Sequence, residues 1–78
     1  MIGMLRGHVE SVDAVSAIIE VGGVGYEVRM PSADLASMHA GQEIKVYTSL
    51  NVSQDAITLF GFGTLASKRM FLQLQKVS

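Results

Sequence analysis

Residues 19–30, IEVGGVGYEVRM, decide the fold that this sequence predicts. Val24, Tyr26, Val28 and Met30 alternate with small or charged residues, so they share one face of an extended chain. Two consecutive glycines precede this alternation and follow another β-branched run, as at the turn of a β-hairpin. The stretch therefore predicts two antiparallel strands, the second of them half buried.

The same period of two extends the prediction to five strands. We expect them at residues 2–6, 14–21, 24–30, 44–50 and 56–62. Between the third and fourth, residues 32–39 predict a short helix that Ser32 can cap, with Leu35 and Met38 facing inward and Gly41 ending it. Five strands with this helix predict a mainly β fold, a five-stranded OB-type barrel.

From Thr64 onward the pattern changes to helical spacing. Apolar residues recur near helical spacing, with basic and amide side chains between them, so an amphipathic helix should follow the barrel. They are Leu65, Phe71 or Leu72, Leu74 and Val77. Too little chain follows for this helix to pack against. We therefore divide the sequence into a barrel at residues 1–63 and, at 64–78, the first helix of a second, truncated domain.

Composition limits the classes of protein that fit. The chain has 78 residues, 49% of them hydrophobic, and no cysteine, so it fits one small folded domain without disulfides or cysteine-bound metal. Neither a membrane-spanning stretch nor a signal peptide is evident, which favours the cytoplasm. Residues 1–63 hold three basic and seven acidic residues, a net charge of −4, whereas 64–78 hold three basic residues and no acid, +3.

Patterns typical of enzymes and metal sites are missing. The glycines at 22, 23 and 25 do not match GxGxxG, no serine lies in a GxSxG turn, and His8 and His39 belong to no metal-ligand motif. We expect no catalysis, no cofactor and no metal, with both histidines at the surface or rim.

An OB-type barrel also raises the possibility of binding single strands through aromatic stacking. Tyr47 is the one aromatic residue that fits an exposed stacking role, and Arg29 and Lys45 should point outward, where they could reach a phosphate. A stand-alone OB module that binds single-stranded nucleic acid or a protein partner therefore stays open as an alternative.

Four ordered segments resemble the N-terminal part of the RuvA family of bacterial Holliday-junction-binding proteins. They are MIGMLRG at 1–7, IEVGGVGYEVRMP at 19–31, AGQEIKVYTSLNVSQDAITLFGF at 40–62 and FLQLQKVS at 71–78. The resemblance implies an OB barrel followed by a helical domain with two helix-hairpin-helix motifs and a flexible C-terminal domain. It also implies a non-catalytic homotetramer that holds four-way junction DNA open for a partner ATPase, RuvB, in recombination and repair. The chain would then be a fragment, ending just before the first hairpin motif.

The resemblance also suggests site residues. Members of the family carry an acidic loop between the fourth and fifth strands that forms a negative pin at the junction centre, and here that pair is Gln54 and Asp55. Gln54 departs from the usual glutamate, so each subunit keeps one of two charges. Arg29 occupies a position that often contacts DNA. The implied mechanism is electrostatic steering, in which the carboxylates repel the DNA backbone at the crossover.

Overall fold

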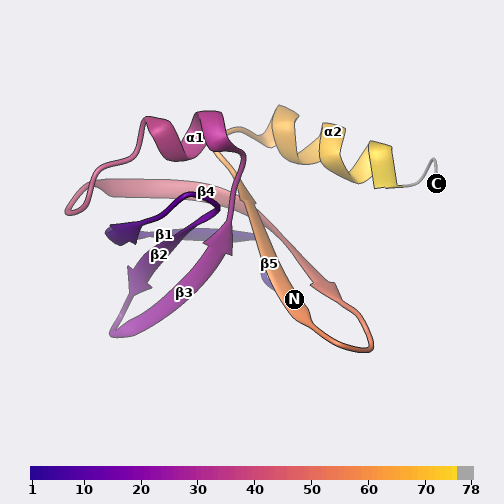
Figure 1. Cartoon of the computed structure of the whole chain (residues 1–78), viewed down its shortest axis with the longest axis horizontal. Helices are drawn as coiled ribbons and strands as arrows, with labels where there is room; N and C mark the ends of the chain where they lie inside the picture. Colours follow the sequence, from indigo (N-terminus) through magenta and orange to yellow (C-terminus); the bar gives the residue numbers. More distant parts are fainter. Residues whose placement is uncertain (76–78) are drawn as a thin grey trace.

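The protein forms a closed five-stranded barrel with one helix between strands and one after them. The computed structural model describes residues 1–75 and is shown in Figure 1. In chain order the elements are β1 (Met4–Val12), β2 (Ser16–Val21), β3 (Val24–Arg29), α1 (Ser32–Ala36), β4 (Glu43–Val52), β5 (Ile57–Phe62) and α2 (Leu65–Gln75). The strands close in the order β1-β2-β3-β5-β4. This arrangement confirms the mainly β, OB-type prediction.

The strands are joined unequally around the barrel. The β1–β2, β2–β3, β1–β4 and β4–β5 contacts are antiparallel, and β1–β4 runs through five residue pairs from Met4↔Tyr47 to His8↔Glu43. The barrel closes between β3 and β5, which are parallel and share two pairs, Val28↔Leu59 and Arg29↔Phe60. The end of β3 is thereby placed beside the middle of β5.

The β2–β3 turn forms where the two glycines predicted it. Gly22 and Gly23 have φ angles of +58° and +89°, a region that side chains with a Cβ disfavour. The Gly23 N–H donates to Glu20 Oε2 at 2.7 Å, which fixes this carboxylate against the turn. The hairpin register follows from this tight connection.

One apolar core fills the barrel. Val9, Ile19, Val28 and Val46 are fully buried, and the cluster continues under α1. Its members are Leu5, Val9, Ala17, Ile19, Val28, Met30, Leu35, Met38, Val46 and Leu59. The predicted inward face of β3 is confirmed at Val28 and at Met30 just after it, whereas Val24, next to the turn, is half exposed. The alternation therefore holds where the strand has core beneath it.

The first two strands differ from their predicted bounds. β1 continues to Val12 because a β-bulge between Val9 and Ser11 lets it bend on along β2. β2 begins at Ser16 because the Asp13 Oδ1 accepts hydrogen bonds from the N–H groups of Val15 (2.9 Å) and Ser16 (2.8 Å), forming a turn before the strand. These bonds stabilise the ionised carboxylate and lower the pKa of Asp13 below its ordinary value.

Helix α1 is shorter than predicted and starts differently. It ends at Ala36, not residue 39, with Ser37 as the C-cap. Ser32 does not cap it: the Pro31 carbonyl accepts from the Asp34 and Leu35 N–H groups at 3.0 and 3.1 Å, so Pro31 is the N-cap. That part of the prediction was wrong because proline already holds the extended conformation that an N-cap needs. Leu35 and Met38 are buried, as predicted.

Helix α2 begins where the period changed. The Thr64 Oγ1 accepts a hydrogen bond from the Ser67 N–H at 3.1 Å, an N-cap contact. Phe71 packs against Phe60 and Phe62 of β5, with 5.0 Å between ring centroids in each pair, so this side chain helps to hold the helix against the barrel. The predicted apolar position Val77 lies outside the described residues. Neither helix within residues 1–75 has the length and hydropathy of a membrane span.

Candidate nucleic-acid interface

The β4–β5 hairpin carries two of the candidate residues at its tip. It projects from the rest of the barrel in Figure 1, and its last cross-strand pair is Val52↔Ile57. Ser53 closes the turn: its N–H and Oγ donate to the Ala56 carbonyl at 2.8 and 3.1 Å, and its Oγ accepts from the Ala56 N–H at 3.2 Å. The turn is thus held by residues on either side of Gln54 and Asp55.

Gln54 and Asp55 are both exposed. Among residues 1–75, neither side chain forms a hydrogen bond or ion pair, so the Asp55 carboxylate presents its charge to solvent and to any ligand. The structure therefore brings the two predicted pin residues together at a protruding point. The hydrogen bonds that close the turn use neither of these side chains.

Arg29 lies on another part of the barrel. It is exposed at the end of β3, opposite Phe60 of β5, and lines a hollow of about 200 Å³ with Glu27, Thr58 and Leu59. On its other side it borders an apolar groove of about 330 Å³ that Met30 and the three phenylalanines line. Within residues 1–75 its guanidinium forms no ion pair, so a phosphate could take both of its parallel N–H donors.

Arg29 and the hairpin tip do not form one compact site. Asp55 lies in the turn that precedes β5, whereas Arg29 of β3 is paired with Phe60, in the second half of that strand. The negative charge and the positive charge therefore lie at different places on the barrel.

Four of the five aromatic rings contact an aromatic or basic side chain. Lys45 Nζ lies 5.3 Å from the centroid of the Tyr47 ring, so one face of the candidate stacker is covered. Phe71 of α2 packs against both Phe60 and Phe62 of β5. This use of the rings counts against the single-strand alternative.

Sequence reasoning missed one basic pair. Arg6 of β1 and Lys45 of β4 are directly opposite in register, and both are exposed. Thirty-nine positions separate them in the sequence, so only the alignment of β1 with β4 could have revealed the pair. Among the strand pairs of the described residues, this is the pair in which two cations are directly opposite each other. It offers a second possible phosphate contact in addition to Arg29.

Fold and surface together define an OB-type barrel domain with a protruding hairpin that is acidic at its tip. The family model described as the RuvA N terminal domain matches residues 1–61. The chain therefore belongs to the RuvA N-terminal domain family.

Individual relatives agree with this assignment. Over all 78 residues, the chain is 69% identical to a protein of Bifidobacterium animalis subsp. lactis, 63% identical to one of Bifidobacterium longum subsp. infantis and 46% identical to one of Corynebacterium diphtheriae. Each relative is named Holliday junction branch migration complex subunit RuvA. The chain spans 38% of the length of each of them.

Proposed function

We propose that this chain is the N-terminal domain of the junction-binding subunit of a Holliday junction branch migration complex. Its membership of the RuvA N-terminal domain family and the names of its relatives support this assignment. The subunit is non-catalytic: it binds four-way junction DNA and holds it open in recombination and repair, while the RuvB ATPase moves the arms. Because its substrate is bacterial chromosomal DNA, the protein works in the cytoplasm.

The proposal includes a division of labour along the chain. Residues 1–63 are the barrel, and residues 64–78 begin a helix-hairpin-helix domain whose phosphate-binding loops supply most of the affinity. The net charge of −4 over residues 1–63 supports this division, because a domain that gripped DNA over its whole surface would be basic. In the complete protein, four subunits form a homotetramer and a C-terminal domain contacts RuvB.

The hairpin tip is the observation that carries the mechanism. Asp55 is exposed, has no partner among residues 1–75 and lies within the turn that Ser53 and Ala56 close. A carboxylate at this position repels phosphates that approach it. Fewer phosphates approach it at the open centre of a four-way junction, so a junction is repelled less than a duplex. Arg29, which is paired with Phe60 of β5, binds a phosphate of an arm instead. Because Gln54 stands where the family usually has a glutamate, the tip carries one negative charge instead of two.

A chimera tests the proposal. This chain would replace the matching 78 residues of the Bifidobacterium animalis relative, and the chimera, the relative and the chain alone would be titrated against a four-way junction, linear duplex and single strands. We expect the chimera to prefer the junction as the relative does, and the chain alone to bind weakly or not at all. Loss of junction preference in a folded chimera would contradict the proposal. Preference for single strands would instead support a stand-alone OB module.

A further inference from the structure

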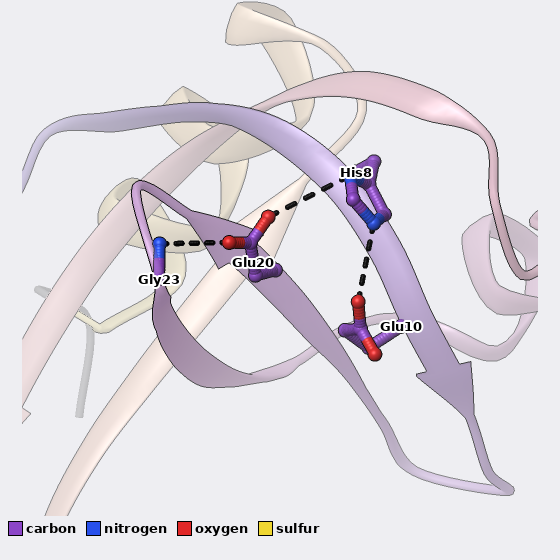
Figure 2. A network of polar contacts seen from close by, with 4 residues as sticks. All are labelled: His8, Glu10, Glu20 and Gly23. Carbon is purple, nitrogen blue, oxygen red and sulfur yellow. Dashed lines mark hydrogen bonds and ion pairs between the residues drawn. The ribbon is translucent and has the colours of Figure 1, made fainter.

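Three ligand-type side chains converge on the outer surface of β1 and β2. His8 Nε2 lies 3.1 Å from Glu10 Oε1, and His8 Nδ1 lies 3.6 Å from Glu20 Oε1 (Figure 2). One potential metal-ligating atom from each of the three residues lies within 4.8 Å of the other two. This cluster is on different strands from the hairpin tip and from Arg29, so the proposed DNA contacts do not use it.

Strand pairing, not sequence spacing, assembles the cluster. His8 and Glu20 are directly opposite in the β1–β2 register. Glu10 falls at the bulge between Val9 and Ser11, where it has no partner on β2, and its carboxylate turns toward His8 in Figure 2. Bulges often redirect a side chain in this way next to functional sites. The sequence predicted no metal site because the ligands are separated by two and twelve positions and match no motif.

The charge around His8 is negative. Glu43 of β4 is opposite His8 on its other side, so glutamates flank the imidazole across both neighbouring strands as well as along its own. Arg6 and Lys45 lie next along the same strands, but within residues 1–75 the two ion pairs formed are both those of His8. A divalent cation bound here would offset the mutual repulsion of these carboxylates.

The distance between His8 and Glu20 suits a small transition-metal ion. A tetrahedral Zn²⁺ with ligands at about 2.0 Å holds their atoms about 3.3 Å apart, close to the 3.6 Å between His8 Nδ1 and Glu20 Oε1, whereas Glu10 contacts the other ring nitrogen. Glu20 is already oriented, because its second oxygen accepts the Gly23 N–H at 2.7 Å and leaves Oε1 facing the ring. Glu10 is the most exposed of the three, with 53% of its side chain accessible, and can swing to the same side of the ring.

We infer that His8, Glu10 and Glu20 form a binding site for a divalent transition-metal ion. One imidazole and two carboxylates are a donor set typical of Zn²⁺, with water as the fourth ligand, whereas Mg²⁺ and Ca²⁺ prefer oxygen donors alone. The ion would lie between Nδ1 of His8 and Oε1 of Glu20 and tie β1 to β2 at the surface. The inference is independent of DNA binding.

Zn²⁺ titration of the protein tests the site. Isothermal calorimetry in a non-chelating buffer should show one bound ion per chain, and NMR should show the His8 ring signals changing while those of His39 stay put. His8→Ala and Glu20→Gln should each weaken binding at least about tenfold, as loss of a group that holds a metal does. Zn²⁺ should also raise the melting temperature of the wild type and not that of His8→Ala.

Matched controls distinguish this site from scattered surface binding. His39 and Glu27 are exposed and belong to no such cluster, so His39→Ala and Glu27→Gln should bind Zn²⁺ as the wild type does. Circular dichroism should confirm that each variant is folded. If His8→Ala does not fold, Glu10→Gln, a substitution at an exposed position, replaces it in the test. Absence of saturable binding at millimolar Zn²⁺, or equal weakening by the control variants, would overturn the inference.

Discussion

Asp55→Asn removes the one charge at the hairpin tip and little else. The turn is closed by bonds between Ser53 and Ala56, and asparagine suits turns as well as aspartate does, so the loop should keep its shape. Asp55 has no ion partner within residues 1–75, so no buried or paired group is left unsatisfied. Any change in DNA binding should therefore report the charge itself.

The expected change in the free energy of DNA binding follows from the exposure of the carboxylate to water. In water, two unit charges about 8 Å apart interact by about 0.5 kcal/mol, which screening reduces to about 0.2 kcal/mol at 0.15 M salt and about 0.4 kcal/mol at 0.01 M. If each carboxylate of the proposed tetramer faces one phosphate of a duplex laid across the centre, four substitutions relieve about 0.8 and 1.6 kcal/mol. Duplex affinity should then rise about 4-fold and about 14-fold, respectively.

The assay is a mobility-shift titration of the chimera and its Asp55→Asn variant against four-way junction and linear duplex across a salt series. Junction binding should tighten less than duplex binding, because fewer phosphates approach the open centre, so the junction preference should fall most at low salt. Gln54→Glu adds a second charge at the same tip and should raise the preference. If Asp55→Asn leaves affinity and preference unchanged at every salt concentration, the carboxylate only shapes the loop and electrostatic exclusion is wrong.

Three further predictions concern the barrel and its helix. Gly7→Ala should lower the free energy of unfolding, measured by urea titration, by about 1–3 kcal/mol. The reason is that the added Cβ would meet the backbone carbonyl of Glu20, which cannot move without shifting the strand. An unchanged free energy would show that β1 shifts freely. The lowered pKa of Asp13 means that its contribution to stability is complete above its unfolded pKa, near 3.8, and is lost as pH falls through the folded value. Asp13→Asn should therefore flatten the dependence of the urea midpoint on pH below about 4, and an unchanged slope would assign that dependence to other carboxylates. Phe71→Ala should release α2 while the barrel stays folded, seen as faster amide exchange confined to α2; exchange as slow as in the wild type would mean that other contacts hold the helix.

The inward- and outward-facing positions of the strands could be predicted because the barrel is a single sheet around one core. Alternation alone identified Val28 as inward-facing and Lys45 as outward-facing, and the structure confirms both. The period change located α2 to within a residue of Thr64. These features depend on local sequence, where side-chain periodicity and capping chemistry carry the information.

The features that the sequence did not predict depend on strand pairing and on hydrogen bonds formed by side chains in loops. The bulge at Glu10 and the alignment of His8 with Glu20 follow from register, which a period of two does not set. The late start of β2 came from an Asp13 turn that a β-branched run concealed. At the candidate interface, the sequence identified Arg29 and the hairpin tip through resemblance, but it could not tell that Lys45 would cover the Tyr47 ring. The DNA roles of Gln54, Asp55 and Arg29 stay predictions.

The two-pair contact between β3 and β5 makes this position the natural place for the barrel to open. The other pairings extend over longer stretches, so amides around Val28 and Arg29 should be the first in the sheet to lose protection from hydrogen exchange. Opening there would leave one five-stranded sheet, still joined between β1 and β4, with Arg29 on one edge strand, β3, and the acidic hairpin at the other edge, β5. A DNA molecule that contacts both edges at their closed spacing binds the closed form better than the open one, so by thermodynamic linkage it would hold the ring shut.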